Sequence, residues 1–127
     1  SHETTQEISV FAPEAEGSWP VAYLLHCYDC SRDDSAEMGR QLASQGFVAF
    51  VPDYRSTEPE KMEPDLTCGY RYARSIAHEY GGDLDQPLTF VGDSYGATLA
   101  ISGGVAEAAS APAVATTNAS PGRHAPT

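Results

Sequence analysis

The pentapeptide Gly92-Asp93-Ser94-Tyr95-Gly96 carries the residue types best suited to covalent chemistry in this sequence. An apolar run at 88–91 precedes it and a run containing Ala, Leu and Ile follows, so the pattern predicts strand, sharp turn and helix with Ser94 at the apex. The two glycines leave room where strand and helix pass close together. Free N–H groups at the helix start would stabilise negative charge near Ser94. We therefore predict that Ser94 is a nucleophile, although a serine here also suits a helix N-cap. Asp93 is interpreted as a supporting residue.

Short apolar and amphipathic runs alternate along the chain before this turn. Nearly continuous apolar runs at 21–26, 47–51 and 88–91 predict strands buried on both faces, and 7–12 predicts a further short strand. Helical spacing of apolar residues predicts helices at 36–45, 65–80 and 94–105, with a polar loop at 53–63. This alternation indicates an α/β fold with three layers, α/β/α, and a mostly parallel sheet.

Three strand ends bring polar residues to one edge of this predicted sheet. His26, Asp53 and Ser94 each follow an apolar run. Because the carboxyl ends of parallel strands meet at one edge, where such sheets bind ligands, we expect the three residues to lie near one another.

The chain divides into a predicted core at 1–105 and a tail at 106–127 rich in Ala, Ser, Thr and Pro. Within the tail, 113–118 fits either a further core strand or a loose end, and the sequence leaves both open.

Composition narrows the classes of partner. A net charge of −11 over 127 residues argues against a nucleic-acid backbone or an anionic membrane surface as partner. The sequence contains neither a membrane-length apolar run nor a signal-peptide pattern, so we expect a soluble chain without a membrane span, cytoplasmic or secreted. The oligomeric state stays open.

Cys27 and Cys30 form a Cys-x-x-Cys directly after a predicted strand. This spacing suits a redox pair or half of a metal site, but there is no second such motif, and Cys68 is distant in sequence. We favour an incidental pair at a strand end and predict no metal site.

Four segments resemble the α/β-hydrolase family, especially its esterase and lipase branch. They are His26 at a strand end, Asp53-Tyr54-Arg55 with Pro59-Glu60, the stretch at 79–83, and the turn around Ser94. Together they span roughly residues 7–105, so the resemblance covers most of the chain, as the N-terminal portion of that fold.

The resemblance implies a carboxylic-ester hydrolase acting on a small-molecule ester without a cofactor. Ser94 would attack the ester carbonyl and form an acyl-enzyme. The backbone N–H of Tyr95 would stabilise the oxyanion, together with an N–H from the turn at Cys27 and Tyr28, with Tyr28 preferred. His26 would hold that turn by hydrogen bonds, and Gly92 and Gly96 would shape the nucleophile turn.

The rest of the catalytic triad fits less well. After Ser94 the sequence offers only Glu107 and His124, both close to the nucleophile turn, and Cys27 stands where the family prefers glycine. We therefore expect little or no ester turnover from residues 1–127 alone. The alternatives are a non-catalytic hydrolase-like binding module, which the incomplete triad favours, and a thiol redox protein using Cys27 and Cys30.

Other polar and aromatic residues near these turns have ordinary structural interpretations. We expect Asp53 and Arg55 to pair and brace the edge of the site. Tyr28 and Tyr95 suit a substrate pocket but also plain packing, and His78 is expected at the surface.

Overall fold

A computed structural model of the chain describes residues 6–93 and 113–116. The strands are β1 (Ile8–Phe11), β2 (Val21–Leu25), β3 (Val48–Pro52), β4 (Thr89–Asp93) and β5 (Ala113–Thr116). The helices are α1 (Ala36–Ser44) and α2 (Pro59–Ile76), with 3-10 turns η1 (Arg32–Ser35) before α1 and η2 (Ala77–Tyr80) after α2.

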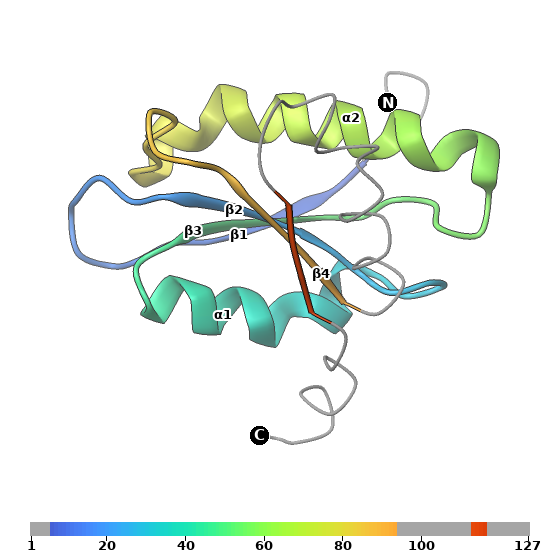
Figure 1. Ribbon diagram of the computed structural model, residues 1–127, viewed down its shortest axis with the longest axis horizontal. Coiled ribbons are helices and arrows are strands. Elements are labelled where there is room, and N and C mark those ends of the chain that lie inside the picture. Colours follow the sequence, from blue (N-terminus) through green and yellow to red (C-terminus); the bar gives the residue numbers. More distant parts are fainter. Residues whose placement is uncertain (1–5, 94–112, 117–127) are drawn as a thin grey trace.

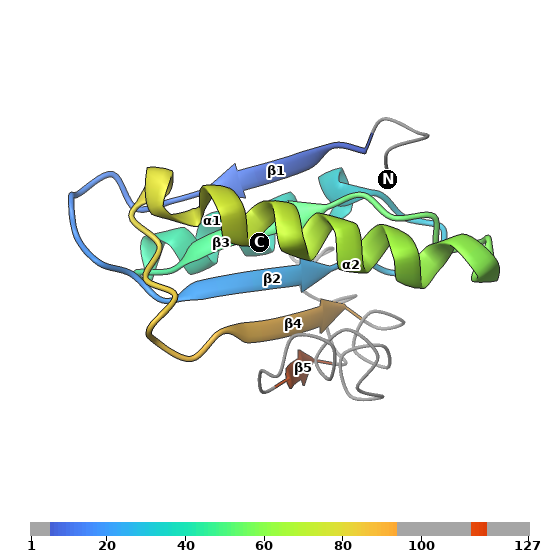
Figure 2. The same ribbon diagram turned by 90° about the horizontal axis from the view of Figure 1, so that it is seen from above.

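The described elements form three layers. The sheet lies between α2 on one face and α1 on the other (Figure 1). Viewed from above, the strand order is β1-β3-β2-β4-β5 (Figure 2). β2 pairs in parallel with both β3 and β4, and β5 pairs in parallel with β4, whereas β1 runs antiparallel to β3. The α/β class and the mostly parallel sheet predicted from the sequence are confirmed.

Side chains of the central strands alternate between two apolar clusters. Tyr23 packs toward α2 with Phe50 and Phe90, whereas Leu24 packs toward α1 with Val51. Both β2 and β3 are buried along their whole length. Helices on both faces of a parallel sheet require this, because successive residues of a strand point to opposite sides.

The helix α2 begins earlier than the sequence predicted. It starts at Pro59, within the segment predicted as a loop, and ends at Ile76, where η2 takes over. Pro59 is favourable as the first helical residue, because an N–H at this position would have no partner within the helix and proline has none. Pro64 lies inside the helix and removes only one backbone donor. The predicted loop at 53–63 is therefore wrong for its second half.

The predicted strand and helix positions elsewhere differ from the structure by one or two residues at the ends. For 113–118, where the sequence left strand and loose end open, the structure has β5 over four of the six residues. The predicted helix at 94–105 lies outside the described residues.

Trp19 closes the edge of the sheet where β2 begins. Its backbone N–H donates to the carbonyl of Gly81 at 2.8 Å, and its carbonyl accepts from the N–H of Asp83 at 2.7 Å. Gly81 has a φ of +86°, which ends η2 in the left-handed conformation that glycine adopts without strain. This edge is opposite the edge that carries the predicted site.

Candidate functional site

The carboxyl ends of β2, β3 and β4 meet at one edge of the sheet. Leu25, the last residue of β2, is in register with Gly92, which is buried in β4. The loop after β3 reaches the end of β2 through a hydrogen bond from the Tyr54 N–H to His26 Nε2, at 3.3 Å. Ser94, Tyr95 and Gly96 lie outside the described residues, as do Glu107 and His124. The roles assigned to them therefore stay predictions.

His26 links the end of β2 to the loop after β3. Its side chain is fully buried, and its ring stacks on Tyr54 with 4.0 Å between the ring centroids. Nε2 accepts from the Tyr54 N–H, so Nδ1 carries the proton and donates to the Cys27 carbonyl at 2.7 Å. The Tyr54 hydroxyl in turn donates to the His26 carbonyl. These contacts are those of a residue that holds the turn.

The His26 ring is held in its neutral form. Burial lowers its pKa below the usual value, and this outweighs the hydrogen bond to the Cys27 carbonyl and the negative charges of Asp53 and Asp34, which favour the charged ring. A second proton would also have to displace the bond that Nε2 accepts. His26 therefore does not act as a proton carrier in the described geometry.

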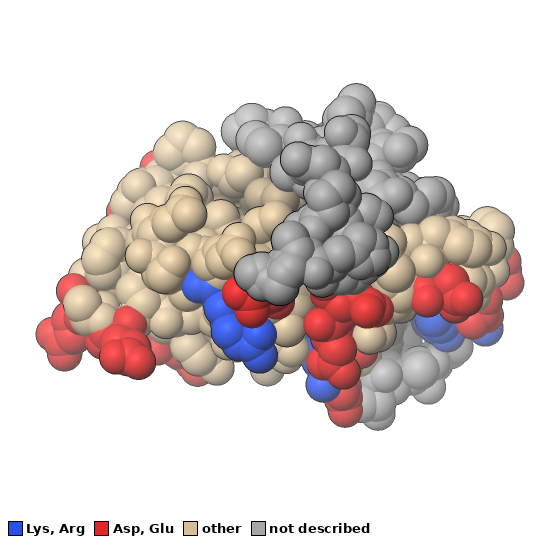
Figure 3. All heavy atoms as spheres, turned by 90° about the horizontal axis from the view of Figure 1, so that it is seen from below, with Lys and Arg blue, Asp and Glu red and all other residues tan. Residues whose placement is uncertain are grey.

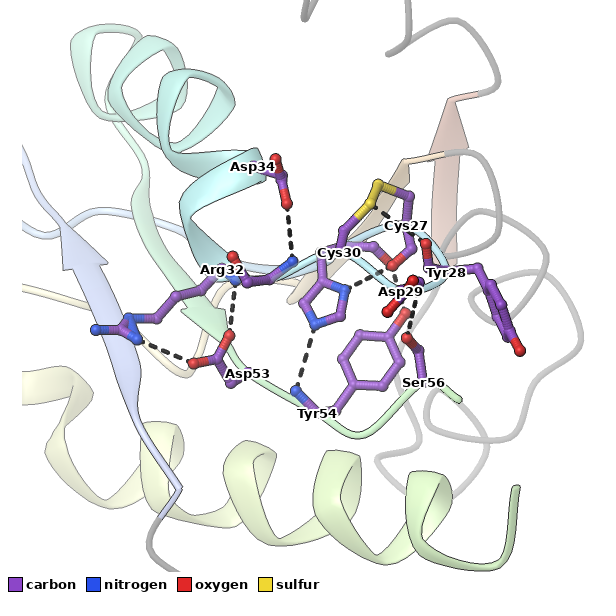
Figure 4. The surroundings of a disulfide bond; sticks show 11 residues. Cys27, Tyr28, Asp29, Cys30, Arg32, Asp34, Asp53, Tyr54 and Ser56 are labelled. Carbon is purple, nitrogen blue, oxygen red and sulfur yellow. Dashed lines mark hydrogen bonds and ion pairs between the residues drawn. A yellow bond between two sulfur atoms is a disulfide. The ribbon is translucent and has the colours of Figure 1, made fainter. Parts of the chain in front are cut away.

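A disulfide closes the turn after β2. Cys27 and Cys30 are bonded, with their Cα atoms 5.2 Å apart, and the Cys30 N–H donates to the Cys27 carbonyl at 3.1 Å. Between them, Asp29 has a φ of +57° and donates its N–H to the Ser56 hydroxyl at 2.7 Å. The Tyr28 side chain is 55% exposed and points away from the disulfide (Figure 4).

This turn is the predicted source of the second oxyanion donor. Cys27 is buried at its start, and Tyr28 stands at its exposed tip. The nucleophile turn lies outside the described residues, so the oxyanion role of the two N–H groups stays a prediction. Ser56 is a support of the turn that the sequence did not reveal, since nothing in its spacing links it to Asp29.

The expected pairing between Asp53 and Arg55 is wrong. Asp53 accepts from the Arg32 N–H at 2.7 Å and pairs with its guanidinium at 2.9 Å, whereas Arg55 pairs with Asp65 in α2. The reason is geometric. Each residue of the loop finds its partner on a different element, Asp53 on η1 and Arg55 on α2. His78 is exposed, as expected.

The Arg55–Asp65 pair fastens the loop after β3 to α2. Asp65 Oδ2 accepts from the Arg55 backbone N–H at 3.0 Å and from Nε at 2.8 Å, and Oδ1 accepts from Nη2 at 2.7 Å. Burial by itself would raise the pKa of the Asp65 carboxyl, but the hydrogen bonds and charge of Arg55 outweigh burial and hold that pKa below its usual value. The carboxylate is therefore charged and paired at neutral pH.

A pocket of about 450 Å³ opens beside the disulfide turn. Three carboxylate residues, Glu7, Asp53 and Asp65, line it with Arg55 and Cys30. Gln6 also lines it and donates to the backbone carbonyls of Asp53 and Asp65 at 2.9 Å each. The side-chain oxygen of Gln6 is buried and has no hydrogen-bond partner among the described residues.

Within residues 6–93 and 113–116, no group of three or more His, Cys, Asp or Glu side chains is placed to hold a metal ion. No helix in the same part of the chain is both long and apolar enough to cross a membrane. The face on the α1 side shows acidic side chains at several places with basic ones beside them (Figure 3).

Solved structures with a similar fold are known. No protein-family model and no curated protein matches the sequence. An esterase from the Planctomycetes species Thermogutta terrifontis, Est2 with propionate bound, is 20% identical with a TM-score of 0.64, over 76% of this chain and 39% of the esterase. The same esterase phosphonylated by sarin gives a TM-score of 0.66 at 18% identity, over 78% and 40%. Vibralactone cyclase gives 0.74 at 16% identity, over 90% and 39%.

These neighbours are α/β-hydrolases in fold, and this chain has part of the same fold. At 16–20% identity the likeness shows the fold alone. The chain spans about 40% of the length of these proteins.

Proposed function

We propose that this chain carries the nucleophile and the oxyanion-stabilising part of a carboxylic-ester hydrolase. Ser94 attacks the ester carbonyl, the alcohol leaves, and water then releases the acid from the acyl-enzyme. The substrate class is a small-molecule ester. One esterase among the structural neighbours, whose structure phosphonylated by sarin is also known, supports this class.

The observation that carries the proposal is the pairing of β2 with β4. Leu25 lies opposite Gly92, so the disulfide turn and the segment after β4 leave the sheet from adjacent strands. The segment that leads from Gly92 to Ser94, two residues on, would therefore begin beside the turn that contains Tyr28. Nucleophile and oxyanion donors need this closeness, because both act on one carbonyl group.

The two donors in the proposal are the backbone N–H groups of Tyr95 and Tyr28. Each such donor typically speeds the reaction by about 10²- to 10³-fold. The proposal assigns no general base within the described residues, because His26 is buried, neutral and bonded at both ring nitrogens. After Ser94 the sequence offers one acid, Glu107, and one histidine, His124.

A phosphonylating probe tests the nucleophile directly. The full-length polypeptide that contains this chain should react with a fluorophosphonate, and peptide mass mapping should place the adduct on Ser94. Ser94→Ala should abolish labelling. The matched control is Ser44→Ala at the exposed end of α1, which should label like the parent. Labelling at another serine would refute the role of Ser94, and no labelling would refute the proposed function and favour the non-catalytic binding module.

A further inference from the structure

We propose that the Cys27–Cys30 disulfide is a redox switch for the ester-hydrolase site. In the oxidised state the turn holds the Tyr28 N–H in place as an oxyanion donor, and reduction by a dithiol releases the turn and slows the reaction. The inference rests on the proposed function for its kinetic readout. The effect of reduction on the turn is argued from the contacts of the described residues.

The disulfide encloses only the two residues that form the tip of the turn. On one side, His26 is fixed by its bonds to Tyr54 and to the Cys27 carbonyl. On the other, the Arg32 N–H is fixed to Asp53 at 2.7 Å. Because both flanks are anchored independently of the disulfide, reduction would loosen Tyr28 and Asp29 and leave the surrounding fold in place.

The backbone at Asp29 depends on outside restraint. Its φ of +57° lies in the left-handed region, which is uncommon for residues with a Cβ and which Asp and Asn adopt more readily than the others. The restraints are the disulfide, the bond from the Cys30 N–H to the Cys27 carbonyl, and the bond from the Asp29 N–H to Ser56. The disulfide is the only covalent one of these three. Its loss gives Tyr28, next to Asp29, more backbone conformations, and a preorganised donor becomes a mobile one.

The pocket gives a reductant access to one of the two sulfurs. Cys30 is partly exposed and lines the pocket, whereas Cys27 is only 8% exposed. A thiolate of the dithiol would bond to Cys30 Sγ while the Cys27–Cys30 bond breaks, and Cys27 leaves as a thiolate that takes up a proton. The second thiol of the dithiol then displaces Cys30, so the protein gains two electrons and two protons and the dithiol becomes a cyclic disulfide.

Charge around the pocket selects among reductants. Three carboxylates line it and pair with two guanidinium groups, Arg55 in the lining and Arg32 beside it, so the cluster keeps a net negative charge of one. An anionic thiol is repelled by such a surface, and a cationic thiol is attracted. At equal thiolate concentration, cysteamine should therefore reduce the disulfide faster than 2-mercaptoethanol, and 2-mercaptoethanesulfonate should be slowest.

Cys68 provides a clean background for the experiment. It is the free cysteine of the described residues, in α2 and partly buried. In the Cys68→Ser full-length polypeptide, alkylation and mass spectrometry should find no free thiol at 27 and 30 after oxidation and two after dithiothreitol treatment. Reduction should slow fluorophosphonate labelling of Ser94 by about tenfold, and reoxidation should restore it.

Hydrogen exchange gives a second readout of the turn. On reduction, the backbone amides of residues 28–30 should exchange faster, and the exchange rate of the Tyr54 amide should stay unchanged.

The variant Cys27→Ser/Cys30→Ser in the same background should label at the slow rate and ignore dithiothreitol. Equal labelling rates in the two redox states would overturn the switch and leave the proposed function standing. Two free thiols after oxidation would overturn it as well. If Ser94 labels in neither state, the proposed function fails and the switch fails with it.

Discussion

His26 shows how one buried side chain can position a turn without taking part in chemistry. Its ring donates to the Cys27 carbonyl at 2.7 Å and accepts from the Tyr54 N–H at 3.3 Å, so one residue joins the ends of two strands. The bond that Nε2 accepts from the Tyr54 N–H requires the neutral ring, because a protonated Nε2 has no lone pair to accept it. Its charge state is therefore coupled to the order of the turn.

This coupling makes a pH prediction. Because burial lowers the folded-state pKa of His26, the unfolded chain binds the proton more readily, and stability present above about pH 6.5 is lost as the pH falls toward the folded-state pKa. His26→Asn should lower the free energy of unfolding by about 2 kcal/mol at pH 8. Urea unfolding measures the pH dependence of stability and the effect of the variant. It can be followed by the fluorescence of Trp19, the single tryptophan in the sequence.

Between pH 8 and pH 5.5 the parent should lose stability, and the His26→Asn variant should lose less. Parallel curves for the two proteins would mean that His26 is not the titrating group. The exposed His78 supplies the control for loss of a histidine, since His78→Asn should change the free energy of unfolding at pH 8 by no more than about 0.5 kcal/mol.

At the scale of elements, the Arg55–Asp65 pair joins the loop after β3 to α2. Asp65→Asn removes the charge of a buried carboxylate that accepts three hydrogen bonds from Arg55. It should lower the free energy of unfolding at pH 7 by about 2 kcal/mol. Because the folded-state pKa of Asp65 lies below its usual value of 3.8, this contribution is present above that value and disappears at lower pH.

The exposed pair Lys61–Glu58, 3.1 Å apart at the start of the same helix, supplies the control. Glu58→Gln should change stability by no more than about 0.5 kcal/mol, because solvent screens such pairs. If both variants lose the same amount by urea unfolding at pH 7, the buried pair has no special role in fastening α2.

The sequence predicts an element well where a local pattern determines it, and poorly where contacts with distant residues determine it. The apolar runs of β2 and β3 identify buried parallel strands, because helices on both faces leave no polar side to the strand. The start of α2 was missed because two prolines in a polar stretch also fit a loop. The partners of Asp53 and Arg55 could not be predicted, since they lie on η1 and α2 and depend on the folded chain.

At the scale of the whole molecule, the two ends of the strands differ in function: one end is closed by backbone contacts, and the other carries the candidate site. The Trp19–Gly81 contact closes the edge where β2 begins, and the candidate site occupies the opposite edge. Substitutions at the edge where β2 begins should therefore change stability without changing reactivity. The convergence of strand ends could be predicted from the alternating pattern, whereas the disulfide could not, because Cys-x-x-Cys spacing also fits thiol and metal chemistry.

Gly81→Ala tests this separation. A Cβ at φ +86° is strained and would lie 3.1 Å from the Gly17 carbonyl oxygen, so unfolding should require about 1 to 2 kcal/mol less. Thermal melting should show a lower Tm, while fluorophosphonate labelling at Ser94 stays at the parental rate below that Tm. Glu79→Ala, exposed in the same turn, is the control and should leave Tm unchanged. A slower labelling rate in Gly81→Ala would show that the two edges are coupled.

The strand order also has a consequence for biosynthesis. Of the described strands, β1 leaves the ribosome before the others, but it pairs with β3, and β2 lies between β3 and β4. β1 therefore gains this partner only after β3 has emerged, and β2 completes its pairing with β3 and β4 only when β4 follows. During that interval, the apolar residues of β2 are those a chaperone would have to shield.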